Sequence, residues 1–221
     1  IERLKTGKTR KEKSGVVWHT QGSGKSLTMV MLAVKMRRDP ELQQYKLVFV
    51  TDRTQLDFQL STTFRDAQNE TVYNADSVAK LKTLLQRDSS DIVTAMVQKF
   101  QDAEQEGDFA NLNTSDKIIV LAYEAHRTQF GNLAMTINAA LPNAPKIGFT
   151  GTPLLKTQKM DQAFGGCIDQ YKINEAVEDG ATVRIIYQGR QVQTDVVGDS
   201  LDALFEEYFK DYSEDDKREI K

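Results

Sequence analysis

Residues 18–29 read Trp-His-Thr-Gln-Gly-Ser-Gly-Lys-Ser-Leu-Thr-Met, and this stretch decides the fold. A short apolar run at residues 16–18 precedes a glycine-rich turn, and a helical pattern at 27–36 follows it. A strand, a glycine-rich turn closed by Lys-Ser and a helix form the context of a phosphate-binding P-loop. Glycines let backbone N–H groups curl around phosphate oxygens, and the helix N-terminus adds unpaired donors and partial positive charge.

The turn supplies a full set of predicted nucleotide contacts. We expect Lys25 to pair with the β- and γ-phosphates and the Ser26 hydroxyl to ligate Mg²⁺. The usual pattern has its first glycine where His19 stands, and the flanking strand and helix argue against the alternative of a solvated loop. Residues 7–9, Gly-Lys-Thr, also match the end of a P-loop motif. They have no flanking apolar strand or helix, so we interpret them as a basic solvated segment. The predicted nucleotide-binding residues are Gln21, Gly22, Ser23, Gly24, Lys25 and Ser26.

Composition places the chain among ordinary globular proteins. Its 221 residues can bury one good core, and 39% hydrophobic and 28% charged residues are typical of that class. Cys167 is the single cysteine, which excludes an internal disulfide and indicates a reducing compartment. We expect Cys167 to be a small half-buried side chain rather than a nucleophile. No apolar run approaches the ~20 residues of a membrane span, and the first residues are polar, so a cytoplasmic location without a membrane is expected.

The net charge of −3 does not by itself indicate a nucleic-acid-binding protein. Charge is nevertheless unevenly distributed, since residues 1–13 are basic and residues 201–221 are acidic. Such runs are more often solvated ends than binding sites, and a global balance says little about a local groove that follows phosphates.

The remaining apolar runs predict an α/β fold. Runs at residues 47–50, 92–97, 118–122 and 146–150 join the one at 16–18, and they are continuous rather than alternating. Continuous apolar strands indicate a mostly parallel sheet with helices on both faces. Helices are expected at 26–38, 54–66, 77–87 and 133–140, a loop at 104–116, an extended strand at 182–193 and an amphipathic helix at 201–210.

Two of these strands end in residues that carry chemistry. Residues 118–127 form an apolar strand that ends in Tyr-Glu-Ala-His-Arg, and Glu124 is placed to orient an attacking water in a P-loop nucleotidase. The alternative for Glu124 is a solvated carboxylate at a strand end. Thr150, Gly151 and Thr152 leave another strand at the same sheet edge, where ligands of open parallel sheets collect. Taken alone, this Thr-Gly-Thr-Pro turn could equally have no role.

Five ordered motifs between residues 15 and 190 resemble superfamily-two helicase-like motors, and specifically the motor (restriction) subunit of type I restriction-modification enzymes. They are His-Thr-Gln-Gly-Ser-Gly-Lys-Ser, Val-Thr-Asp-Arg-Thr-Gln-Leu at 50–56, Val-Gln-Lys-Phe at 97–100, Glu-Ala-His-Arg-Thr-Gln at 124–129 and Gly-Phe-Thr-Gly-Thr-Pro-Leu at 148–154. The resemblance implies a RecA-like domain that hydrolyses ATP, with Mg²⁺, to translocate double-stranded DNA. It also implies methylation and specificity subunits as partners.

The same resemblance assigns roles to individual residues. Lys25, Glu124 and His126 would be catalytic, and Ser26 would bind the metal. Thr150, Gly151 and Thr152 would link the nucleotide state to the DNA-bound state. Thr51, Arg53, Gln98 and Lys99 would contact DNA, although Arg53 could instead be a charge at the start of a helix. Residues 1–14 would be a basic lead-in, 15–175 the first RecA-like ATP-binding motor domain, and 176–221 an extension toward a second motor domain.

The chain also departs from the family pattern. Family members carry a nuclease domain before the P-loop and a second motor domain with an arginine finger after residue 221, so we interpret the chain as a fragment. Tyr123 stands where the family has Asp, and a neutral phenol is a poor Mg²⁺ ligand. Two alternatives therefore stay open, namely a nucleotide-binding module without turnover and a motor domain of another superfamily-two helicase or remodeller.

Overall fold

The structure is a computed structural model. It describes residues 1–52, 62, 71–124, 129–152, 164–186, 188, 201–213 and 216–217, with side chains in 129–132 and 201–202 left out. Two compact units are present, Ile1–Val183 and Arg184–Lys221. Residues 53–61, including Arg53 and most of the helix expected at 54–66, lie outside the described part, as does His126.

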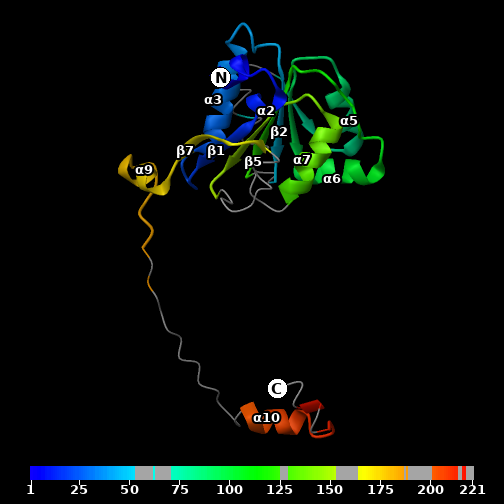
Figure 1. Cartoon of the computed structure of the whole chain (residues 1–221), viewed down its shortest axis with the longest axis vertical. Coiled ribbons are helices and arrows are strands. Elements are labelled where there is room, and N and C mark those ends of the chain that lie inside the picture. Colours follow the sequence, from blue (N-terminus) through cyan, green and yellow to red (C-terminus); the bar gives the residue numbers. More distant parts are fainter. Residues whose placement is uncertain are drawn as a thin grey trace. The chain divides into compact units, whose positions relative to one another are not determined.

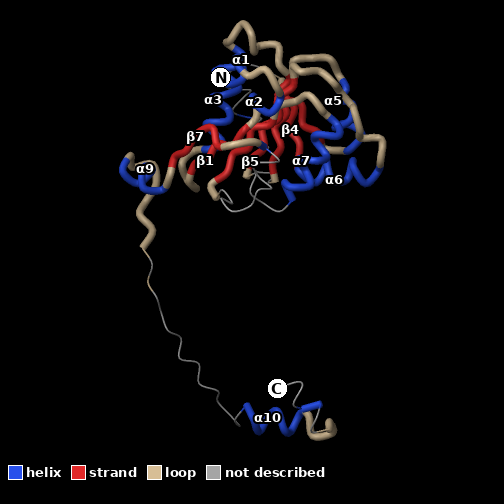
Figure 2. Tube along the Cα trace, viewed as in Figure 1, coloured by secondary structure: helices blue, strands red, loops and turns tan. Residues whose placement is uncertain are grey.

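A seven-stranded sheet organises the first unit, in the order β3-β4-β2-β5-β6-β1-β7 among the described residues. Each neighbouring pair of these strands is parallel. Figures 1 and 2 show the strands at the centre with helices on either side. This confirms the predicted α/β fold with a parallel sheet. The strands are β1 (Gly15–His19), β2 (Lys46–Thr51), β3 (Val72–Ala75), β4 (Ile92–Met96), β5 (Ile118–Tyr123), β6 (Lys146–Thr150) and β7 (Cys167–Tyr171).

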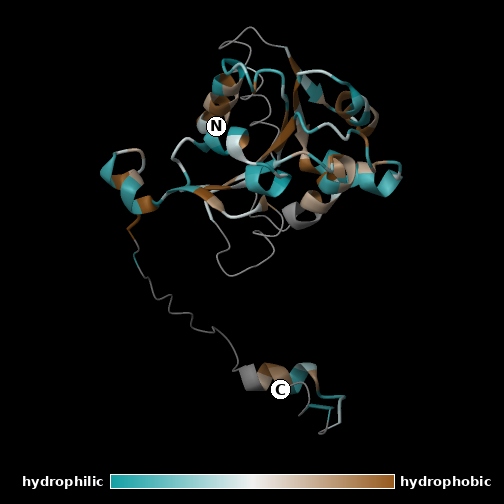
Figure 3. Ribbon diagram, turned by 45° about the horizontal axis from the view of Figure 1, so that its top comes forward, coloured by the Kyte–Doolittle hydropathy of each residue, from teal (hydrophilic) through white to brown (hydrophobic). Residues whose placement is uncertain are grey.

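The central strands are buried on both faces, which explains their continuous apolar sequences. Along β2, Leu47 and Phe49 pack into one core cluster, while Val48 and Val50 pack into the other. Successive side chains of a strand point to opposite faces, so two layers of helices are needed to cover such a strand. Figure 3 shows these strands as mainly hydrophobic, with hydrophilic residues on the outer sides of the helices.

Helix α3 (Lys25–Arg37) covers one face, and α5 (Val78–Gln86), α6 (Val97–Glu106) and α7 (Gln129–Ala140) cover the other (Figure 1). Helix α5 shows how the local sequence determines where a helix begins and which side of it is buried. The Ser77 hydroxyl caps its first turn by accepting from Lys80 N at 3.3 Å. Its buried residues recur at helical spacing and pack on the sheet; they are Val78, Leu81, Leu84 and Leu85.

Several sequence expectations need correction. Helix α6 occupies residues expected to end a strand and begin a loop, and strands β3 and β7 were not predicted. Residues 182–186 form no strand, and most of 187–193 lies outside the described residues. Cys167 is exposed on β7 rather than half-buried. Helix α10 (Leu201–Tyr208), in the second unit, agrees with the helix expected at 201–210.

The N-terminal segment is more structured than a solvated basic stretch. It forms α1 (Glu2–Thr6) and α2 (Arg10–Lys13), and Leu4 is buried in the core under α3. The Thr9 side chain caps α2, so a short helix does follow the Lys8-Thr9 pair, contrary to expectation. Among the described helices, which include α9 (Ile173–Glu178), none has the length and apolarity to cross a membrane.

Candidate nucleotide-binding site

The P-loop connects β1 to α3 and depends on glycine at two positions. Gly22 and Gly24 have φ values of 80° and 81°, in the left-handed region that side chains with a Cβ rarely adopt. Gly24 is the N-cap residue of α3, so the free N–H groups of that helix face the loop. The Ser23 hydroxyl donates to Thr20 O at 2.6 Å and closes the turn.

Lys25 points back across the sheet edge and is only 4% exposed. Its Nζ donates to Thr20 O at 3.3 Å and lies 3.5 Å from Glu124 Oε1. The same ammonium is 6.0 Å from the centre of the Tyr123 ring. The loop lysine and the acid at the end of β5, about a hundred residues apart in sequence, therefore form one site.

Strand β6 lies between β1 and β5, and Gly151 follows its last residue. A Cβ built on Gly151 would lie 3.1 Å from Lys25 Nζ and 3.0 Å from Gln21 Cγ. The absence of a side chain at Gly151 thus gives Lys25 its path to Glu124. Thr150 is fully buried, and its hydroxyl accepts from Thr152 N at 3.1 Å, which fixes the turn beside the P-loop.

Glu124 holds an unusual backbone conformation with φ at 55°. Non-glycine residues pay of order 1–2 kcal/mol in this region, and such strain concentrates at functional sites. The residue is also only 7% exposed, and its carboxylate is turned to the Lys25 ammonium. An acid held in this way at the end of a strand next to a P-loop is suited to orienting a water beside a phosphate.

Strand β7 braces the outer side of the loop, and no sequence signal indicated this. His19 Nε2 lies 2.7 Å from Asp169 Oδ2, and the Tyr171 ring meets the His19 ring edge-on at 5.7 Å. Thr20 N donates to Tyr171 O at 2.9 Å, so β7 pairs with the chain up to the start of the P-loop. A Cβ on Gly22 would lie 3.6 Å from the Thr182 hydroxyl, which brings the segment after α9 to the same loop.

The described candidates for DNA contact lie at one edge of the sheet, where Thr51 of β2 pairs with Met96 of β4, but they differ in exposure. Thr51 is fully buried as the last residue of β2, so its side chain is not accessible to a DNA backbone in this arrangement. Gln98 and Lys99 lie in the first turn of α6, at the carboxyl end of β4. Lys99 Nζ is 3.4 Å from Asp102, and its side chain remains 32% exposed. Gln98 Oε1 is buried and has no hydrogen-bond partner within the described part of the chain.

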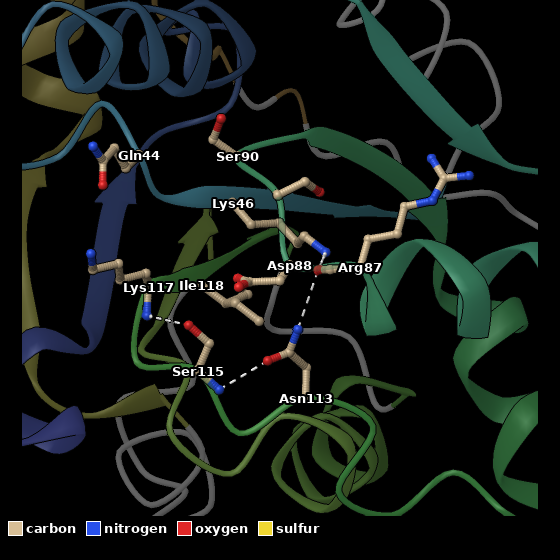
Figure 4. A pocket seen from close by; sticks show the side chains of 10 residues that line it. Gln44, Lys46, Arg87, Asp88, Ser90, Asn113, Ser115, Lys117 and Ile118 are labelled. Atoms are coloured by element: carbon tan, nitrogen blue, oxygen red, sulfur yellow. Dashed lines mark hydrogen bonds between the residues drawn. The ribbon is translucent and has the colours of Figure 1, made fainter.

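A cavity of about 330 Å³ opens at the other edge of the sheet, where β2 and β5 begin (Figure 4). Lys46 lies in its wall, and its Nζ donates to Leu84 O at 2.6 Å, Leu85 O at 3.3 Å and Arg87 O at 2.5 Å. Burial lowers the pKa of Lys46, against the raising effect of nearby carboxylates. All three of its N–H groups thus stabilise the C-terminus of α5, so Lys46 is a structural cap rather than a ligand-binding group.

Known proteins resemble this chain in sequence over most of its length. Residues 1–218 match the family model of the SWI2/SNF2 ATPase. The HindI type I restriction enzyme endonuclease subunit of Haemophilus influenzae is 40% identical over 216 residues, covering 87% of this chain and 20% of that protein. The putative MjaIXP endonuclease subunit of Methanocaldococcus jannaschii is 37% identical over 194 residues, covering 87% of this chain and 18% of that protein. The chain thus spans about a fifth of the length of these relatives.

Solved structures show the same fold. The Hef helicase domain of Pyrococcus furiosus superposes with a TM-score of 0.53 at 17% identity, covering 72% of this chain and 34% of that one. The UvsW helicase of bacteriophage T4 gives a TM-score of 0.50 at 16% identity, covering 71% and 54%. The resemblance to type I restriction subunits and the helicase-like α/β fold, both predicted from the motifs, are confirmed.

Proposed function

The chain belongs to the SWI2/SNF2 ATPase family, and we propose that it is the first motor domain of a type I restriction enzyme endonuclease subunit. In this role it couples ATP hydrolysis to the translocation of double-stranded DNA before cleavage. The observation that carries the proposal is the convergence of Lys25, Glu124 and Gly151 at the carboxyl edge of the sheet. The relatives that are 37–40% identical are type I restriction endonuclease subunits by name.

The nucleotide phosphates bind against the backbone N–H groups of the P-loop and the N-terminus of α3. Lys25 then turns its ammonium from Glu124 and Thr20 O to the β- and γ-phosphates, since a polyphosphate carries more negative charge than one carboxylate. Glu124, released from Lys25, accepts a hydrogen bond from the attacking water and orients it toward the γ-phosphorus. His126 and the Thr150-Gly151-Thr152 turn would relay the nucleotide state to the DNA site.

Mg²⁺ is the metal expected with ATP, and Ser26, in the first turn of α3, would supply a hydroxyl ligand. The other ligand that such sites draw from a neighbouring strand is a carboxylate, and Tyr123 does not supply one. The residues present therefore fit Mg²⁺ only in part.

DNA would bind at the carboxyl edge through Gln98 and Lys99 at the start of α6, and through Arg53. Lys and Arg suit this role because contacts to the DNA backbone are electrostatic. Methylation and specificity subunits would assemble with the full-length protein, which would work in the cytoplasm. Tyr123 favours a second candidate function, that of a nucleotide-binding module that does not hydrolyse ATP.

Calorimetric titration with ADP tests the nucleotide site. We expect Lys25→Ala to weaken binding by about 10- to 100-fold, the range for losing a hydrogen bond to a charged group. Lys117→Ala is the matched control, because Lys117 is an exposed lysine at the opposite edge of the sheet. Equal ADP affinity in parent and Lys25→Ala, with both folded by circular dichroism, would refute the assignment.

A further inference from the structure

Tyr123 ends β5 directly before Glu124 and turns its ring to the P-loop lysine. Its side chain is partly buried, with the ring centre 6.0 Å from Lys25 Nζ. P-loop nucleotidases hold Mg²⁺ between the Ser or Thr after the loop lysine and an Asp from a neighbouring strand. Tyr123 thus presents an aromatic face where the metal requires an anionic oxygen.

The acids described at this edge of the sheet include Glu124 and Asp52, and they do not belong to any group of three metal ligands within the described residues. Glu124 is the acid at this strand end, and its Oε1 lies 3.5 Å from the Lys25 ammonium. Before a nucleotide binds, a divalent cation placed against Glu124 would meet that ammonium, and the repulsion is strong because both side chains are nearly buried. Once the phosphates draw Lys25 away, the proposed function engages Glu124 with the attacking water and not with a metal. Within the described part of the chain, no three acidic, histidine or cysteine side chains come together to hold a metal. Mg²⁺ prefers six oxygen ligands and gives up water reluctantly, so Ser26 alone offers little binding energy.

Phosphate recognition, in contrast, is complete without a metal. Two left-handed glycines shape the loop, the first turn of α3 supplies free N–H groups, and Lys25 brings a buried positive charge. The ring of Tyr123 leaves that charge with a single carboxylate partner, Glu124, among the ion pairs of the described residues. An Asp at the same position would add a second carboxylate near Lys25.

We propose that this chain binds adenine nucleotides in a way that depends little on Mg²⁺, with Lys25 supplying the positive charge that the metal shares in other P-loop proteins. The proposal rests on the proposed function, because it concerns the same nucleotide site. Tyr123 is the residue that sets this property, so a single substitution restores metal dependence.

The test measures the affinity for a non-hydrolysable ATP analogue by calorimetry, once with excess MgCl₂ and once with excess EDTA. For the parent chain we expect the two dissociation constants to agree within about threefold, a difference of less than 1 kcal/mol. Tyr123→Asp should bind at least about tenfold more tightly with Mg²⁺ than with EDTA, since it supplies the missing anionic ligand. Tyr123→Phe is the matched control, because it keeps the ring and removes the hydroxyl, and it should behave as the parent.

The outcomes separate this proposal from the function on which it rests. A parent chain that loses tenfold or more in affinity with EDTA overturns the metal-independent site while supporting a nucleotide-binding function. If nucleotide binding depends on Mg²⁺ in the parent but not in Tyr123→Phe, the phenol oxygen is a metal ligand. This result also overturns the proposal of a metal-independent site. A parent that binds no nucleotide in either buffer refutes the proposed function itself. The parent measurement decides the matter even if Tyr123→Asp does not fold.

Discussion

Lys146 begins β6 as a buried cation that has no acidic partner among the described residues, and its removal should stabilise the protein near neutral pH. The residue is 2% exposed, and its Nζ hydrogen-bonds to Asn138 Oδ1. Arg10 donates to the same oxygen at 2.7 Å. Burial, with a smaller contribution from the Arg10 charge, lowers the pKa of Lys146 from 10.5 to about 8.

The size of the effect follows from this pKa. A fall from 10.5 to about 8 corresponds to a penalty of about 3 kcal/mol on the charged form in the folded state. Loss of the hydrogen bond to Asn138 offsets about 1 kcal/mol, and Arg10 still satisfies that oxygen. We therefore expect Lys146→Met to raise the free energy of unfolding by about 2 kcal/mol at pH 7.

The pH dependence gives the sharper test. Between pH 8 and 10.5 the unfolded chain keeps the Lys146 proton while the folded chain releases it, so the free energy of unfolding of the parent rises with pH. By pH 10 this gain is about 2 kcal/mol, and the advantage of Lys146→Met should have disappeared. Urea unfolding of both proteins at pH 7, 8, 9 and 10 measures the difference.

The control is Lys117→Met, which removes an exposed lysine just before β5, on the same edge of the sheet. Its difference from the parent should stay constant across the same pH values. If the difference between the parent and Lys146→Met also stays constant within about 0.5 kcal/mol, the amine is not held at a lowered pKa and the reasoning is wrong.

Two further predictions concern the nucleotide and DNA sites. Gly151→Ala should tighten nucleotide binding about fivefold, because its Cβ would press on Lys25 Nζ at 3.1 Å only while that ammonium is paired with Glu124, a strain of about 1 kcal/mol that is relieved when the phosphates draw Lys25 away. Gly166→Ala, whose Cβ would meet nothing within 4 Å, should leave affinity unchanged in the same titration. Duplex DNA should bind weakly, with a shallow dependence of affinity on salt, because few phosphates are contacted. Fluorescence anisotropy with two unrelated duplexes checks this, and tight binding that discriminates between them would contradict it.

The sequence predicted the centre of the sheet well because those strands are buried on both faces. Residues 47–50 of β2 and 118–122 of β5 alternate between two core clusters, so these positions are all apolar and each run is visible in the sequence. The edge strands lack that signature. Strand β7 reads Cys-Ile-Asp-Gln-Tyr and is largely exposed, and β3 has four residues of which one is buried. An edge strand is defined by its pairing partner, which local sequence does not reveal.

In the candidate site, too, some features follow from local sequence and others depend on the order of the strands. The P-loop residues were identified from local pattern, because left-handed turns demand glycine at Gly22 and Gly24. The path of Lys25 past Gly151 to Glu124 depends on strand order and could not be predicted from any one segment. The brace of His19 by Asp169 depends on β7 and was missed for the same reason. The resemblance made Thr51 a candidate for DNA contact, and its burial at the end of β2 depends on the neighbouring strands, which the motif does not show.

The strand order also determines how the site would respond to a nucleotide. Strand β6 separates β1 from β5, so Lys25 reaches Glu124 only across the turn at Gly151. Without phosphate, the ammonium holds the carboxylate at 3.5 Å, and the acid is not available to orient a water. A phosphate that attracts Lys25 releases Glu124 in the same movement. Under the proposed function, the water is therefore oriented only when the γ-phosphate is in place, and the turn at Gly151 lies directly against the side chain that moves.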